Sequence, residues 1–122
     1  MTVKTAWLEA EDYPRLLACA DLGVCLHTSS SGVDLPMKVV DLFGVGVPVA
    51  AVGFPALPEL VKHKVNGVVF KDGEELGALL LHLFTESNGL EQLRKLKDGA
   101  VKEGERRWDD EWERIAAPVF GL

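Results

Sequence analysis

The hydrophobic and polar positions of the chain follow two different periods in alternation. Apolar runs rich in β-branched residues occupy 22–27, 47–52 and 68–70, and a weaker run occupies 2–7. Such runs are typical of strands, and the continuous ones are typical of strands buried on both faces of a parallel sheet. Between and after them, apolar residues recur at helical spacing, which predicts helices over 11–20, 36–45, 58–62, 74–84, 90–103 and 108–120.

This alternation of strands and helices predicts an α/β fold with a parallel sheet and right-handed crossovers. The pattern gives about four strands, whereas an open sheet of this type usually has about five or six. From the sequence we therefore expect the chain to begin inside a domain.

Composition and charge narrow the class of protein. The chain has 122 residues, of which 48% are apolar and 26% charged, as in an ordinary one-domain globular protein. Its net charge of −6 argues against a nucleic-acid partner, which would require a basic surface. Apolar runs stay below the roughly 18 residues of a membrane span, and the first residues do not resemble a signal peptide. Cys19 and Cys25 are expected to be reduced core residues of a soluble, cytosol-facing chain.

Candidate chemistry concentrates where the strand 22–27 ends. His27 is followed by a loop of hydroxyl-bearing residues and glycine, residues 28–34, which leads into the helix 36–45. In open α/β sheets, ligands bind beyond the carboxyl ends of the strands, and a helix N-terminus offers free N–H groups to a diphosphate. Asp34, Lys38 and Asp41 form one polar stripe on a helix that its other residues predict to be nearly buried. Asp41 lies roughly 7.5 Å along the axis from Pro36, about the distance from a diphosphate to a ribose.

Each of these residues also has a purely structural interpretation. Asp34 would then cap the helix and pair with Lys38, while Asp41 would be solvated. His27 would bond to loop backbone, and the serines 29–31 would form turns. The spacing alone leaves the functional and the structural interpretation open.

Longer segments carry a family resemblance. Residues 36–49, PMKVVDLFGVGVPV, are similar to the donor-site helix of two-domain (GT-B) glycosyltransferases, which have an acidic residue seven positions before a proline that opens the next strand. Here these are Asp41 and Pro48. Residues 57–61 and 66–70 are similar to a second conserved block of that superfamily. More narrowly, residues 20–41, 5–8 and 107–112 resemble the β-mannosyltransferases that add the first mannose to the lipid-linked N-glycan core.

The resemblance implies a Rossmann-like parallel sheet flanked by helices, corresponding to part of the C-terminal, donor-binding half of a GT-B enzyme. Residues 1–104 would be the nucleotide-sugar-binding domain, and residues 105–122 a helical segment that packs on it or on an N-terminal domain. It further implies a GDP-mannose donor, a dolichol-diphosphate-chitobiose acceptor, inversion at the sugar carbon, the cytosolic face of the endoplasmic reticulum and no essential metal or cofactor. The expected donor-binding residues are His27, Ser30, Ser31, Gly32, Leu35, Pro36, Met37, Lys38 and Asp41, with Trp7 and Glu59 as further candidates.

The chain departs from the family pattern in one respect. Many related enzymes have two glutamates separated by seven residues; Asp41 takes the second position, but Val33 takes the first. The general base is expected in the N-terminal domain, so we expect the 122 residues alone to lack transferase activity. The alternative is a non-catalytic nucleotide-sugar-binding module, or a truncated paralogue that acts with a partner chain. A missing neighbour strand also predicts marginal stability or self-association.

Overall fold

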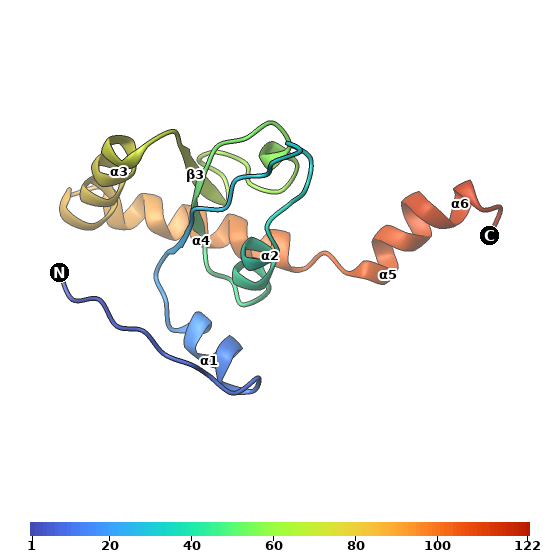
Figure 1. Cartoon of the computed structure of the whole chain (residues 1–122), viewed down its shortest axis with the longest axis horizontal. Helices are drawn as coiled ribbons and strands as arrows, with labels where there is room; N and C mark the ends of the chain where they lie inside the picture. Colours follow the sequence, from blue (N-terminus) through green and yellow to red (C-terminus); the bar gives the residue numbers. More distant parts are fainter.

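Three parallel strands form a sheet in the order β1-β2-β3, of which β3 is labelled in Figure 1. The structure is a computed structural model and describes all residues, Met1–Leu122. β1 (Gly23–Cys25) pairs with β2 (Val49–Val52), which pairs with β3 (Gly67–Phe70), so the predicted parallel α/β architecture is confirmed. The remaining elements are α1 (Asp12–Ala18), α2 (Met37–Gly44), the 3-10 turn η1 (Leu57–Glu59), α3 (Gly73–Thr85), α4 (Gly89–Gly104), α5 (Trp108–Glu111), the π-helical η2 (Trp112–Ala116) and α6 (Ala117–Val119).

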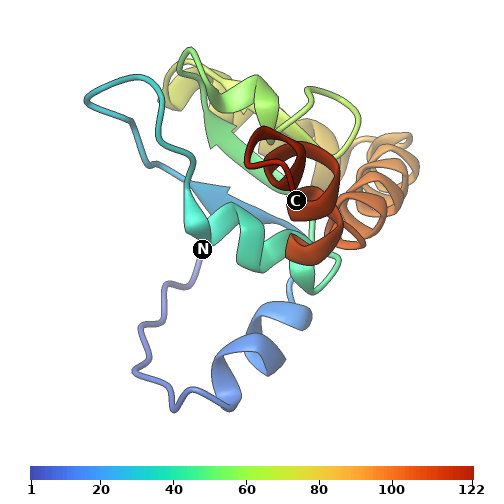
Figure 2. The same ribbon diagram turned by 90° about the vertical axis from the view of Figure 1, so that its right-hand side faces the viewer.

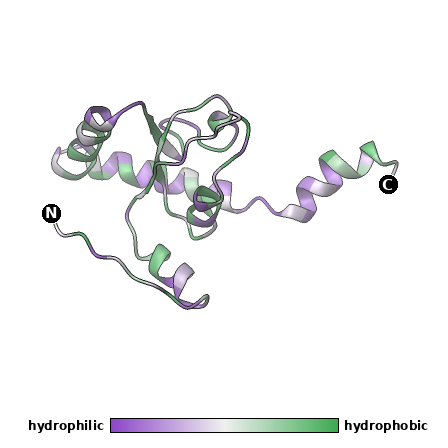
Figure 3. Ribbon diagram, in the orientation of Figure 1, coloured by the Kyte–Doolittle hydropathy of each residue, from purple (hydrophilic) through white to green (hydrophobic).

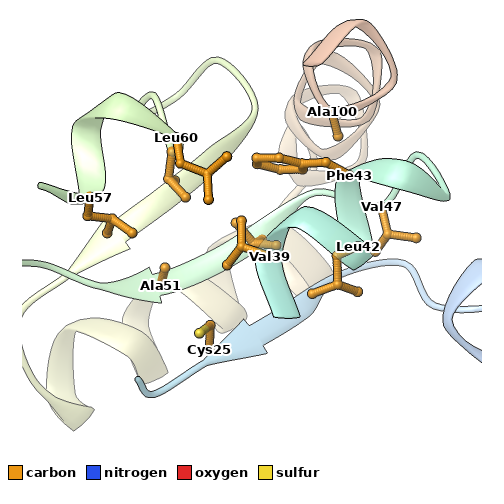
Figure 4. Close-up of a cluster of buried hydrophobic side chains, with 11 residues drawn as sticks. Cys25, Val39, Leu42, Phe43, Val47, Ala51, Leu57, Leu60 and Ala100 are labelled. Carbon is orange, nitrogen blue, oxygen red and sulfur yellow. The ribbon is translucent and has the colours of Figure 1, made fainter. Parts of the chain in front are cut away.

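The central strand β2 separates two hydrophobic clusters. Successive side chains of a strand point to opposite faces, and accordingly Val49 and Ala51 join one cluster whereas Ala50 joins the other. The first cluster lies under α2 and η1 (Figure 4), and the second lies under α3 and α4. The sheet is thus covered by helices on both faces, which is why β2 reads in the sequence as an uninterrupted apolar run.

Helix α4 passes close to backbone outside its own helix. A β-carbon at Gly99 would stand 2.0 Å from the carbonyl oxygen of Val65, and one at Gly104 would stand 2.1 Å from that of Phe43. Ala100, fully buried between them, belongs to the α2-side cluster (Figure 4). Small residues therefore let this long helix span from the α3 side of the sheet to α2.

The C-terminal turns α5, η2 and α6 form one helical segment that projects from the sheet domain (Figure 1). Its aromatic rings stack on one another: Trp108 lies 6.2 Å from Trp112, and Trp112 lies 5.9 Å from Phe120, between ring centroids. Trp108 and Phe120 remain largely exposed. Apolar positions of α1 and α6 likewise stand out in the hydropathy-coloured view (Figure 3).

Several expectations about the N-terminal third are wrong. Residues 2–7 form no strand, because no neighbouring strand pairs with them, and Trp7 is fully exposed. β1 is an edge strand in which Cys25 is buried but Val24 is about half exposed, so the run 22–27 is not covered on both faces. Cys19 is exposed, since α1 buries no residue.

Two helices also differ from their expected form. The predicted helix 58–62 is reduced to the single 3-10 turn η1. α2 is amphipathic rather than nearly buried: Val39, Leu42 and Phe43 face the sheet, whereas Val40 is 54% exposed. The apolar count along α2 overestimated its burial because the side that carries Val40 stays largely exposed.

Candidate functional site

Two loops meet beyond the carboxyl ends of β1 and β2. The first connects β1 to α2, and Figure 2 shows it extending from the end of β1 before the chain returns into the helix. The backbone N–H of Ala56, in the second loop, donates to the carbonyl of Gly32 at 3.1 Å. The rings of His27 and Phe54 meet edge to face, with centroids 6.1 Å apart. These contacts fix the two strand-end loops to each other at the edge where α/β proteins bind ligands.

Asp34 organises the first loop. Its carboxylate accepts hydrogen bonds from the hydroxyls of Ser29 and, at 3.3 Å, Ser31, and its Oδ2 lies 3.1 Å from Nε2 of His27. The Ser29 hydroxyl in turn accepts from the N–H of Gly32 at 2.7 Å. The hydrogen bond from Ser29 and then the contact with His27 lower the pKa of Asp34.

This arrangement excludes the structural interpretation that Asp34 caps α2 and pairs with Lys38. The residue at the N-cap is Pro36, with extended backbone and no side-chain cap. The sequence suggested a cap because an aspartate stood just before a helix. The loop instead turns its carboxylate back toward three hydrogen-bond donors within the loop.

The start of α2 leaves backbone donors free. Val39 N donates to the carbonyl of Pro36 at 3.1 Å, whereas the N–H groups of Leu35, Met37 and Lys38 meet no protein acceptor. The first N–H groups of any helix lack partners within the helix, and they carry the positive end of its dipole. This end of α2 can therefore receive the oxygens of an anionic group.

Lys38 and Asp41 stand on the same exposed flank of α2. Lys38 forms no ion pair, so its ammonium group is available to a ligand. Asp41 accepts a hydrogen bond at 3.1 Å on Oδ2 from the hydroxyl of Tyr13, which comes from α1. Partial burial, followed by the hydrogen bond and the charge of Asp41, raises the pKa of Tyr13.

A concave region lies on the other flank of α2, with a volume of about 460 Å³. It brings together two of the expected site residues, Leu35 and Glu59, and reaches the root of α5 at Trp108. Its charged rim is internally paired, since Arg106 contacts Glu103 at 2.6 Å. Glu103 also pairs with Lys62, and Arg106 with Glu111.

The expected site residues thus fall into four places. His27, Ser31 and Gly32 share the loop organised by Asp34, while Ser30 makes no side-chain hydrogen bond. Leu35, Pro36, Met37, Lys38 and Asp41 follow at the start and along the first turns of α2. Glu59 lies in the cavity on the other flank, and Trp7 lies apart from all of them in the extended N-terminal segment.

Two contributors escaped the sequence analysis, Phe54 and Tyr13, and nothing in the sequence distinguishes Ser29 from Ser30. Tyr13 lies 28 residues from Asp41 in the chain, and Phe54 lies 27 residues from His27. No local pattern connects residues at such separations.

Two further properties of the structure concern metals and membranes. No group of three or more His, Cys, Asp or Glu side chains is placed to hold a metal ion. None of the helices combines the length and the apolar character that crossing a bilayer demands.

The parallel sheet and its helical layers define a Rossmann-like α/β domain. Comparison with known protein families shows to which family this domain belongs. Residues 3–86 match the family model described as glycosyl transferases group 1, and the chain belongs to this family.

Curated relatives are similar over almost the entire chain. The chitobiosyldiphosphodolichol beta-mannosyltransferase of Candida albicans is 51% identical, over 97% of this chain and 26% of its own length. The human protein of the same name is 56% identical, over 96% of this chain and 25% of its own. A protein of Arabidopsis thaliana named UDP-glycosyltransferase TURAN is 54% identical, over 96% of this chain and 26% of its own. The chain therefore spans about a quarter of the length of the curated relatives it matches.

Proposed function

We propose that this chain forms the donor-nucleotide half-site of an inverting β-mannosyltransferase that uses GDP-mannose. The observation that carries the proposal is the set of free N–H groups at the start of α2, beside the unpaired Lys38 and the exposed carboxylate of Asp41. The names of the relatives support mannose transfer to a dolichol-linked chitobiose.

Each group would have a defined task. The N–H groups of Leu35, Met37 and Lys38 would bind the diphosphate oxygens, and the Lys38 ammonium would offset their charge. Asp41 would accept hydrogen bonds from the ribose hydroxyls. When the acceptor hydroxyl attacks the anomeric carbon, the bond to GDP breaks and negative charge grows on the diphosphate, where these preorganised donors stabilise it.

The relatives are much longer than this chain, and their additional regions would supply the rest of the enzyme. The acceptor site and the general base that removes the proton of the attacking hydroxyl would come from regions outside these 122 residues. The full enzyme would act at the cytosolic face of the endoplasmic reticulum. The 122 residues by themselves would bind nucleotide without transferring mannose.

Titration calorimetry of the chain with GDP, GDP-mannose and UDP tests the donor site. We expect GDP and GDP-mannose to bind and Asp41→Ala to weaken both by about tenfold or more, because a hydrogen bond to a charged group contributes about 1.5–3 kcal/mol. Asp98→Ala is the matched control: it also removes one carboxylate from a helix, but Asp98 makes no side-chain hydrogen bond or ion pair.

The outcomes separate the possible donors. Equal weakening in both variants would mean that the loss of affinity does not come from a contact made by Asp41. Preference for UDP over GDP would favour the chemistry named in the Arabidopsis relative over that of the mannosyltransferases. Absence of binding by a folded chain would overturn the half-site.

A further inference from the structure

The carboxylate of Asp41 has a single protein partner. The Tyr13 hydroxyl donates to Oδ2 at 3.1 Å, and no lysine, arginine or histidine lies within ion-pair distance of Asp41. Lys38, one turn earlier on the same flank of α2, leaves this carboxylate uncontacted. The orientation of Asp41 therefore depends on one phenol from a different helix.

Helix α1 is fixed to the rest of the structure near Asp41. Leu17 and Ala20, at and after the end of α1, pack against the cluster that contains Leu42. Leu42 is the neighbour of Asp41 in α2 and is itself 7% exposed. The apolar contact sets the position of α1, and the hydroxyl of Tyr13 then reaches the carboxylate from the start of that helix.

An ionised carboxylate has two oxygens and about four positions that accept hydrogen bonds. Tyr13 occupies one position on Oδ2, which leaves about three positions, on Oδ1 and Oδ2, for further donors. Two adjacent hydroxyl groups, such as those of a ribose, supply two donors at the right separation. A carboxylate held in one orientation can accept fully from both hydroxyls of such a diol without first losing side-chain freedom, so a ligand that lacks one hydroxyl loses a well-formed hydrogen bond.

We propose that Tyr13 is a positioning residue that orients Asp41 for the two hydroxyls of the donor ribose, so that it sets the preference of this site for ribonucleotides over deoxyribonucleotides. The inference rests on the proposed donor half-site. Tyr13 itself does not touch the nucleotide. Its hydroxyl acts through the carboxylate, and its removal should change selectivity for the sugar more than affinity for the diphosphate.

The test is titration of the folded chain with GDP and 2′-deoxy-GDP, comparing wild type, Tyr13→Phe and Asp41→Asn. Phenylalanine keeps the ring and removes only the hydroxyl. We expect wild type to prefer GDP over 2′-deoxy-GDP by about tenfold, the factor given by one hydrogen bond to a charged group. In Tyr13→Phe this ratio should fall to about two- or threefold, in line with a weaker, unoriented hydrogen bond. Arg15→Ala, on the same helix and away from Asp41, should retain the wild-type ratio.

A double-mutant comparison separates positioning from general destabilisation. If Tyr13 acts through Asp41, the double variant Tyr13→Phe/Asp41→Asn should discriminate no less than Asp41→Asn alone, because contacting residues are not additive. Thermal unfolding of each variant establishes that the titrated protein is folded.

The results of these titrations test the role of Tyr13 separately from the proposed donor half-site. A wild-type ratio that survives unchanged in Tyr13→Phe overturns the positioning role while leaving the donor half-site in place. Independent, additive losses in the double variant also overturn it. A folded wild-type chain that binds neither nucleotide overturns the proposed half-site, and the role of Tyr13 with it.

Discussion

At the scale of single residues, the candidate site contains two carboxylates, and the folded chain gives each of them its own hydrogen-bond partners. Asp34 is surrounded by Ser29, Ser31 and His27, and Asp41 is held by Tyr13. The two aspartates are close in sequence but have different roles. Asp34 forms hydrogen bonds within its own loop, whereas Asp41 is exposed and can still accept further hydrogen bonds. Their environments, not their residue type, separate the structural carboxylate from the candidate ligand-binding one.

The loop carboxylate gives a pH-dependent prediction. The hydrogen bond from Ser29 lowers the pKa of Asp34 below its ordinary value of 3.8. A group whose pKa is lowered by folding contributes stability that is fully present above its unfolded pKa and is lost as pH falls through its folded pKa. We therefore expect Ser29→Ala to raise the pKa of Asp34. At a pH between the pKa of Asp34 in the wild type and that in the variant, the loop of the variant should then be looser than that of the wild type. Carboxyl-carbon NMR titration of wild type and Ser29→Ala measures this shift, and an unchanged pKa would contradict the role of Ser29.

At the scale of elements, helix α4 connects the helices on the two faces of the sheet. It packs on α3 at its beginning and on α2 at its end, and glycines allow its backbone to approach other backbone atoms there. In an exposed helix, glycine costs stability relative to alanine. At these contacts the same residue is required, because there is no space for a side chain.

Two glycine-to-alanine substitutions should therefore change stability in opposite directions. Gly99→Ala should destabilise the chain by about 1–3 kcal/mol, since the new β-carbon overlaps the Val65 carbonyl. Gly77→Ala, within α3 and with no atom near the new methyl group, should stabilise it by about 0.5–1 kcal/mol. Urea unfolding of both variants measures the signs. A stabilising Gly99→Ala would mean that α4 does not pack as described.

Part of this element structure was readable from the sequence. The apolar periodicity predicted α3 and α4 to within one residue at each end, and strong local signals explain the success: α3 begins after Asp72, whose side chain accepts from the N–H of Glu75 at 2.9 Å. Residues 2–7 and the exposed face of β1 were mispredicted. A strand is completed by its neighbours, and the apolar character of a segment does not state whether a neighbour is present.

At the scale of the whole molecule, the structure exposes apolar surface at one edge of its sheet. β1 has a free edge, and Val24 and Leu26 are 48% and 69% exposed. Leu16 of α1 is also about half exposed. An unpaired edge beside apolar side chains is a surface on which another chain can pair.

Concentration-dependent self-association of the chain should follow, and Val24→Lys should weaken it by about tenfold or more, because burying a valine contributes about 1.5–3 kcal/mol. Light scattering coupled to size-exclusion chromatography over a range of concentrations measures the effect. Leu81→Lys is the control, since Leu81 is an exposed apolar residue on α3, away from β1. Equal effects of both variants, or a monomer at every concentration, would contradict association through this edge.

The sequence by itself determined the alternation of strands and helices, the central buried strand and the position of a polar loop before an amphipathic helix. These follow from side-chain periodicity and local backbone chemistry, which act over a few residues. Only the tertiary structure decided which donors surround Asp34, that Tyr13 reaches Asp41, and that α4 meets the backbone at Gly99. Such contacts join residues far apart in the chain or depend on the exact path of a loop, and their geometry exists only once the helices have packed on the sheet.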